Sequence, residues 1–194
     1  MQDILFRAQS PDAAHVFTHL FTEDALAQAQ AADAACLSGA PLGALHGLPI
    51  TLKDNFDVAG QTTMSGTLVC QGESFATQDA PVVQRLRKAG AVLLGKTNMS
   101  EFAFSGVGIN PHYGTPLNPC DAHLPRVPGG SSAGAAVSVA LGLAFAALGT
   151  DTGGSIRIPS ALCGLVGFKG TQSRIPLDGV MELSRSLDTV GHCP

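Results

Sequence analysis

Apolar residues along this chain alternate between helical spacing and short continuous runs, which is the pattern of an α/β protein with a largely buried sheet. Over residues 11–37 the apolar positions recur at helical spacing, and they predict a helical lead-in across residues 1–40, with Ser10 or Asp12 as its N-cap. Residues 48–53 then form an apolar run bounded by polar turns, which predicts a strand.

The same alternation continues through the rest of the chain. Asp79 as an N-cap, an early proline and a late group of basic residues predict a helix that ends at Gly90, and residues 91–94 predict the next strand. The uncharged stretch 131–150 contains too many serines and glycines for a transmembrane helix. It predicts a buried helix of small residues, a turn, and a buried strand over residues 143–148.

Composition narrows the class of protein. With 194 residues the chain can form one sizeable core, and a net charge of −4 without a cluster of Lys and Arg argues against nucleic-acid binding. The N-terminus lacks the basic and apolar regions of a secretory signal. Five widely spaced cysteines without a C-x-x-C pair predict free thiols in a cytoplasmic protein. His15 and His19 lie four apart on the predicted helix but lack a third ligand, so no metal site is predicted.

Two uncharged turns rich in glycine and serine carry the strongest chemical signal. Residues 128–134 and 149–160 lie on either side of the small-residue segment, so both can contribute to one site. Glycine permits backbone conformations and close approaches that bring amide groups and hydroxyls to a ligand. This arrangement favours nucleophilic chemistry over a plain linker.

Two short motif matches in this chain lack the context that their chemistry requires. Residues 90–97 fit the P-loop pattern, but a predicted helix precedes them and their middle is an apolar strand rather than a polar phosphate-binding loop. Residues 130–134 fit G-x-S-x-G, with Ser132 as the nucleophile of an α/β-hydrolase. A proline-containing loop precedes that motif, and His192 is the only histidine after it.

A third interpretation uses a lysine as the base. Burial can lower the pKa of a lysine until it is neutral near pH 7. Lys53 ends a predicted buried strand beside a polar turn, although from position alone a solvated strand-end lysine is the simpler interpretation.

The whole set of motifs resembles the amidase signature family. The resemblance runs from about residue 42 to 191 and rests on five segments in the same order, with Ala133 where many members have glycine; the segments are residues 48–55, 95–102, 129–134, 149–159 and 164–171. It implies a three-layer α/β/α fold with a mixed central sheet. The chain would be the N-terminal part of a single domain over 1–194, with catalytic motifs in residues 42–191.

The resemblance also implies an amide hydrolase that works without cofactor or metal. Ser155 would be the nucleophile that forms an acyl-enzyme, Ser131 would relay the proton, and a neutral Lys53 would be the base. The family has a cis peptide between residues 130 and 131. Ser132, Thr150 and Ser160 are expected to be hydrogen-bond supports.

Backbone amides of the second turn would bind the oxyanion of the tetrahedral intermediate. The four amides implied are those of Thr152, Gly153, Gly154 and Ser155. Asp151 and Arg157 flank this turn, and we expect them to form a pair that fixes its shape.

Family members are longer than this chain, so the resemblance predicts a truncated product with an exposed sheet edge and weak or absent activity. Its partner would be a small-molecule amide substrate, with a homodimer or amidotransferase-type partner subunits as further expectations. Two alternatives stay open. One is the glutamine-hydrolysing component of a tRNA-dependent amidotransferase, and the other is a non-catalytic remnant.

Overall fold

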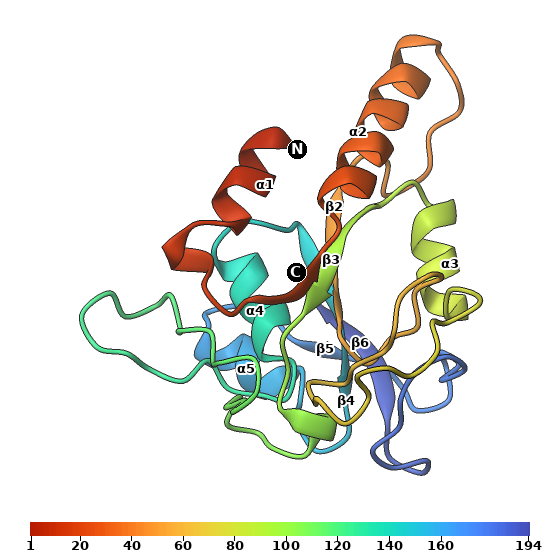
Figure 1. The fold of residues 1–194 in the computed structure, drawn as a ribbon. Coiled ribbons are helices and arrows are strands. Elements are labelled where there is room, and N and C mark those ends of the chain that lie inside the picture. The colour runs from red at the N-terminus through yellow and green to blue at the C-terminus, as the bar shows by residue number, and fades with distance from the viewer.

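Six strands form one mixed sheet in the order β1-β3-β2-β4-β6-β5 (Figure 1). The computed structural model describes residues 1–194. β2, β3 and β4 run parallel, whereas β1 pairs antiparallel with β3, and β6 pairs antiparallel with both β4 and β5. The strands are β1 (Phe17–Leu20), β2 (Pro49–Lys53), β3 (Val92–Thr97), β4 (Ala146–Asp151), β5 (Phe168–Lys169) and β6 (Thr189–Cys193).

Helices cover both faces of this sheet, which confirms the predicted α/β fold with three layers (Figure 1). Val82 and Val83 of α3 pack with Leu93 on one face, and Leu5 of α1 packs with Val137 of α4 on the other. α2 projects beyond the sheet (Figure 1). The helices are α1 (Gln2–Ala8), α2 (Thr22–Leu37), α3 (Pro81–Lys88), α4 (Ala133–Ala140) and α5 (Arg157–Leu162), with short 3₁₀ turns η1 (Pro11–Ala13) and η2 (Glu101–Ala103).

The predicted helical lead-in is wrong at residues 17–20, which form the edge strand β1. Phe17 pairs with Thr97 of β3, and the amide of Phe21 donates to the Leu94 carbonyl at 2.9 Å. These long-range hydrogen bonds override the local helical spacing, because propensity is a weak prior against tertiary context. The helix that the periodicity detected is α2, which begins only at Thr22.

Two smaller expectations also need correction. The strand predicted over residues 143–148 runs instead from Ala146 to Asp151, because the amide of Leu143 bonds back to the carbonyl of Ser138 and closes the end of α4. The N-cap of α3 is Ala80, not Asp79. The Asp79 carboxylate instead accepts hydrogen bonds from Arg87 and from a loop amide.

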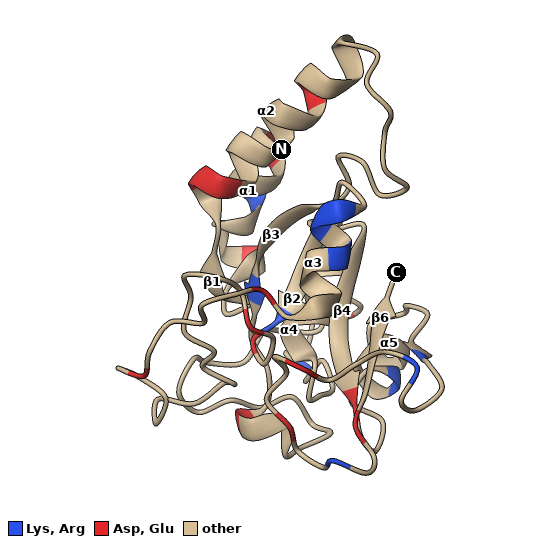
Figure 2. Cartoon of the chain, turned by 90° about the vertical axis from the view of Figure 1, so that its right-hand side faces the viewer, with Lys and Arg blue, Asp and Glu red and all other residues tan.

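The other predicted elements are confirmed. β2, β3, α3 and the small-residue helix α4 form where the sequence predicts them, and residues 92–97 are a fully buried strand rather than a phosphate-binding loop. No helix combines the length and the apolar character needed to cross a membrane. All five cysteines are free thiols. The basic side chains of α3 gather in its last turn (Figure 2).

Alternation along β2 directs its last side chain toward the layer that contains α4. Ile50 and Leu52 belong to the core beneath α3, whereas the hydroxyl of Thr51 meets that of Ser138 on α4 at 2.9 Å. Successive residues of a strand point to opposite faces. Lys53 therefore points to the same face as Thr51, toward the turn that precedes α4.

Candidate active site

Lys53 ends β2 as a fully buried side chain among hydroxyl groups. Its Nζ lies 2.7 Å from Ser131 Oγ and 2.8 Å from Thr150 Oγ1. Asn55 Nδ2 donates to the same Thr150 hydroxyl at 3.1 Å. Lys53 therefore has no carboxylate bonded to it, and its hydrogen-bond partners leave it free to be neutral.

Burial lowers the pKa of Lys53 to about 7, against a partial opposing effect from the Asp188 and Asp151 carboxylates. Removing an ammonium group from water disfavours its charged form, which is the usual reason for a lowered lysine pKa. A lysine with a pKa near 7 is neutral in about half of the molecules at that pH. Lys53 thus fits the role of a base far better than a solvated strand-end lysine would.

Ser131 is placed by the first glycine-rich turn, where the peptide between Gly130 and Ser131 is cis. Its side chain is fully buried, and its carbonyl accepts a hydrogen bond from the Ser100 amide at 3.1 Å. A Cβ on Gly130 would lie 2.6 Å from the amide nitrogen of Gly108, so only glycine fits there. The close packing of this turn fixes the hydroxyl of Ser131 against Lys53.

Ser155 lies in the second turn, directly against the first. The amide of Ser132 donates to the carbonyl of Ser155 at 3.1 Å, which joins the two turns one residue beyond Ser131. Ser155 is 8% exposed, whereas Lys53 and Ser131 are completely covered. The structure therefore brings the three residues together from three separate segments and leaves Ser155 as the member nearest to solvent.

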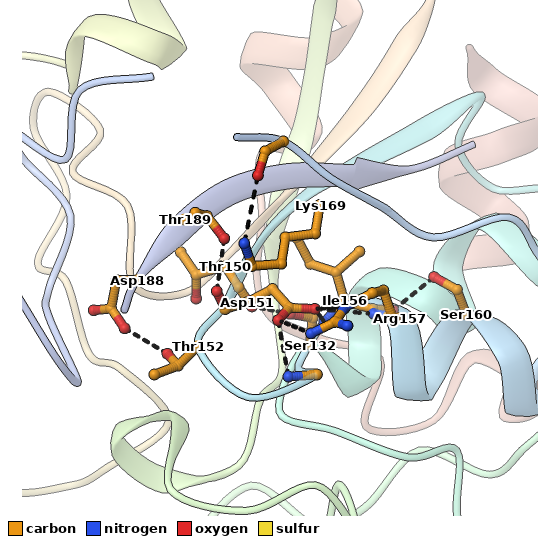
Figure 3. A network of polar contacts seen from close by, with 12 residues as sticks. Ser132, Thr150, Asp151, Thr152, Ile156, Arg157, Ser160, Lys169, Asp188 and Thr189 are labelled. Carbon is orange, nitrogen blue, oxygen red and sulfur yellow. Dashed lines mark hydrogen bonds and ion pairs between the residues drawn. The ribbon is translucent and has the colours of Figure 1, made fainter. Parts of the chain in front are cut away.

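The carboxylate of Asp151 organises the second turn (Figure 3). It accepts hydrogen bonds from the amides of Gly154, Ile156 and Arg157, and the Arg157 guanidinium donates to both of its oxygens at 2.9 and 3.0 Å. Burial alone would raise the pKa of Asp151, but the hydrogen bonds from Arg157 and from these amides lower it. The expected pair of Asp151 and Arg157 thus forms and fixes the shape of the turn.

The same contacts determine which amides of the turn are free. The amide of Gly154 already donates to Asp151 Oδ1 at 2.8 Å. The amides of Thr152, Gly153 and Ser155 have no protein acceptor, so they can donate to a ligand. The predicted oxyanion site is therefore supplied by these three amides in this structure, and Gly154 holds the turn in shape.

The competing motif residues lie apart from this arrangement or support it. Ser132 is buried and its hydroxyl donates to the Thr150 carbonyl at 3.4 Å, while His192 lies on β6 against the ring of Phe168. The lysine of the P-loop match, Lys96, forms a buried ion pair with Asp54 at 3.3 Å.

The paired histidines considered for a metal do not share a helix, which corrects that expectation. His15 has a positive φ of 63° in the turn before β1, and His19 lies on β1 itself. The structure gathers no group of three His, Cys, Asp or Glu side chains that could hold a metal ion.

Two residues of the site have no role that the sequence alone assigns. Asn55 lies two positions after Lys53 in a motif that carries the family resemblance, and it orients the Thr150 hydroxyl. Asp188 precedes β6, and its carboxylate accepts a hydrogen bond from Thr152 (Figure 3). Each belongs to a conspicuous polar motif, but only the folded chain shows what it touches.

The fold and the lysine–serine site define an amidase-type hydrolase domain. The sequence profile of the Amidase family matches residues 2–193, and the chain belongs to that family. Over 163 residues it is 47% identical to a 2-amino-5-chloromuconic acid deaminase of Comamonas testosteroni, covering 84% of this chain and 35% of that protein. Over 192 residues it is 48% identical to the A component of the glutamyl-tRNA(Gln) amidotransferase of Chromohalobacter salexigens, covering 98% and 38%.

Solved structures show the same fold. A crystal structure of an amidase superposes with a TM-score of 0.90 at 44% identity, and it covers 99% of this chain and 43% of the other. The native peptide amidase of Stenotrophomonas maltophilia gives a TM-score of 0.85 at 40% identity, with 99% and 40% covered. The chain thus spans roughly two fifths of the length of the relatives it matches.

Proposed function

We propose that this chain carries the catalytic residues for hydrolysis of a carboxamide to a carboxylate and ammonia or an amine, with Ser155 as nucleophile. The observation that carries the proposal is the buried Lys53, whose Nζ lies 2.7 Å from Ser131 Oγ and whose pKa is lowered to about 7. A neutral amine held against a hydroxyl is a base ready to accept a proton. The adjoining position of Ser155 provides the hydroxyl that loses it.

In the first half of the proposed reaction, Ser155 Oγ attacks the carbonyl carbon of the amide. The proton of Ser155 passes to Ser131 as the proton of Ser131 passes to Lys53, so the charge of the tetrahedral intermediate is balanced by the ammonium of Lys53. The same relay then returns the proton to the leaving nitrogen. The C–N bond breaks, the amine departs, and the acyl group stays on Ser155 as an ester.

In the second half, water replaces the amine. Lys53 takes a proton from water through Ser131, the hydroxide attacks the ester carbon, and the proton returns to Ser155 Oγ as the carboxylate leaves. In both halves the negative oxygen faces the amides of Thr152, Gly153 and Ser155. A single donor of this kind typically lowers the barrier by about 3 kcal/mol.

A fluorophosphonate probe tests the proposed nucleophile. Ser155 Oγ should displace fluoride and form a stable phosphonyl ester, which mass spectrometry of the digested protein locates on the peptide that contains Ser155. Ser155→Ala should abolish the adduct, whereas the matched neighbour variant Ser132→Ala should keep it. Labelling at Ser132 would support the α/β-hydrolase alternative, and absence of labelling on folded protein would support a non-catalytic remnant.

The pH dependence of that labelling tests the proposed base. Lys53 must be neutral to accept the proton, and burial lowers its pKa to about 7. Below pH 7 the rate should therefore rise about tenfold per pH unit, and above that value it should level off. A rate that keeps rising to pH 10 would mean that Lys53 titrates as an ordinary lysine and is not the base.

A second candidate is the glutamine-hydrolysing component of a tRNA-dependent amidotransferase. The observation that favours it is the 48% identity to the A component of such an enzyme over 98% of this chain. In that case the carboxamide is that of glutamine, and ammonia passes to partner subunits. Glutaminase activity that rises on addition of such partners would support this candidate, whereas hydrolysis of simple amides without partners would support a free-standing amidase.

A further inference from the structure

We propose that Asp188 is a positioning residue for the proposed hydrolysis, acting on both the oxyanion turn and the base. Its carboxylate holds Thr152 at the start of that turn, and it supplies the uncompensated negative charge that acts on Lys53. The inference rests on the proposed function only in the meaning of these roles. The contacts and the charge are properties of the folded chain.

The first argument is geometric. The Asp188 side chain is buried immediately before β6, with 5% of the residue exposed. One carboxylate oxygen accepts a hydrogen bond from the Thr152 hydroxyl, and the other accepts from the amides of Leu183 and Ser184 at 2.8 and 3.0 Å (Figure 3). The carboxylate therefore ties the turn that contains free amides to a separate loop.

The next residue strengthens this attachment. The hydroxyl of Thr189 donates to the carbonyl of Asp151 at 2.7 Å, and β6 pairs with β4 so that Thr189 lies opposite Asp151. The turn is thus held at its first residue by Asp188 and at the preceding strand end by Thr189. Loss of the Asp188 carboxylate would release Thr152, whose amide is one of those available to an oxyanion.

The second argument is electrostatic. Two carboxylates act on Lys53, namely Asp151 at the end of β4 and Asp188 before β6. Asp151 is paired with Arg157 at 2.9 Å, so its charge is largely balanced. The donors to Asp188 are a hydroxyl and two backbone amides, all of them uncharged. Asp188 therefore acts on Lys53 with its full charge.

The remaining groups around Lys53 do not change this account. Ser131 and Thr150 contribute hydroxyls, and Asn55 contributes a neutral amide. Asp54 follows Lys53 in the chain, but its charge is balanced by Lys96 at 3.3 Å.

The charge of Asp188 has a definite chemical use. Burial alone drives the pKa of Lys53 downward, and the two carboxylates oppose that effect. A base whose pKa falls far below the working pH is neutral but binds a proton weakly, so its catalytic power declines. Asp188 keeps the proton affinity of Lys53 in the range where a base is effective at neutral pH.

NMR titration of lysine Cε carbons measures this effect without any catalytic assay. The chain contains only four lysines, so each ¹³Cε signal can be assigned, and Lys53 is identified by its loss in Lys53→Met; the four are Lys53, Lys88, Lys96 and Lys169. Asp188→Asn preserves the shape of the side chain and removes its charge. We expect it to lower the titration midpoint of Lys53 by about one pH unit.

Two control variants separate charge from structure. Glu182→Gln removes a negative charge from the same loop, where Glu182 pairs with the exposed Arg185, and it should leave the Lys53 midpoint unchanged. Thr152→Val removes the hydroxyl bonded to Asp188 but keeps the charge, so it should slow fluorophosphonate labelling several-fold with an unchanged midpoint. An unchanged midpoint in folded Asp188→Asn, or an equal shift in Glu182→Gln, would overturn the proposal.

Arg157→Gln tests the same electrostatic account if Asp188→Asn does not fold. It exposes the charge of Asp151 to Lys53, so the midpoint should rise, and an unchanged midpoint would contradict the claim that Arg157 balances Asp151. The titration also distinguishes this inference from the proposed function. A shifted midpoint in a chain that the probe never labels would reject the proposed hydrolysis alone, whereas labelling at Ser155 with an unshifted midpoint would reject the role of Asp188.

Discussion

Lys53→Met is expected to make the folded chain more stable at pH 7 while it almost abolishes the reactivity of Ser155. Burial lowers the pKa of Lys53 from 10.5 to about 7, so between these values the unfolded chain binds a proton that the folded chain does not. The stability therefore rises with pH across this window, and the penalty is largest below pH 7. Each pKa unit corresponds to about 1.4 kcal/mol, which makes the full penalty on the order of 4–5 kcal/mol.

Methionine removes that penalty but leaves the hydroxyls of Ser131 and Thr150 without the amine. Unpaired buried hydroxyls cost about 1–3 kcal/mol in total when they can partly re-pair, so the expected net gain is about 2 kcal/mol at pH 7. The gain should shrink as the pH approaches 10. Fluorophosphonate labelling of Ser155 should fall by roughly 10³-fold or more, because the relay has lost its base.

Chemical denaturation at pH 7 and pH 10, together with labelling rates, measures both effects. Lys88→Met is the matched control, because Lys88 is an exposed lysine at the end of α3, and it should change neither quantity. A destabilised Lys53→Met protein, or one that is labelled within tenfold of the natural rate, would contradict a neutral buried base at this position.

Gly134→Ala is expected to lower the free energy of unfolding by about 3 kcal/mol, since its site has no room for a methyl group. An added Cβ would lie 2.3 Å from the Val16 carbonyl oxygen and 2.7 Å from the Asn98 amide nitrogen. Both contacts are with backbone, which cannot rotate away as a side chain can. The amide of Gly134 also donates to the Asn98 carbonyl at 2.8 Å, so the first turn of α4 must lie this close.

Thermal unfolding should show this loss as a fall in Tm of roughly 6–12 °C for a domain of this size. Gly170→Ala is the matched control, because the nearest atoms to an added Cβ there lie 3.9 Å away. Equal Tm values for the two variants would mean that α4 can shift outward without loss. Because Ser131 lies just before α4, the Gly134 variant should also label more slowly at Ser155.

The parts of the molecule that local sequence determines can be predicted from the chain alone. β2 and α4 are predictable because an apolar run and a stretch of small residues each have one favoured element. β1 is not, because Phe17 is placed by a partner 80 positions away on β3, and no local pattern contains that pairing. The cap assigned to Asp79 is wrong for the same reason, since its partner Arg87 competes with the helix end for its carboxylate.

The site divides along the same line. Lys53, Ser131 and Ser155 can be identified through motifs that occur in a fixed order, and the structure brings all three together. The pairing of Asp188 with Thr152 depends on how β6 docks beside β4, and this arrangement is not written in either segment. The amide of Gly154 likewise can be assigned to Asp151 only when the turn is seen closed.

The separation of Lys53 from its partners along the chain makes the reactive serine a reporter of folding. Lys53 lies 78 residues from Ser131 and 97 residues from Thr150, so their contacts form only when distant strands have docked. Such long-range contacts form late, because closing a large loop costs chain entropy. During synthesis or refolding the chain therefore carries an inert hydroxyl at Ser155, and a probe added during refolding would measure the moment at which the sheet is complete.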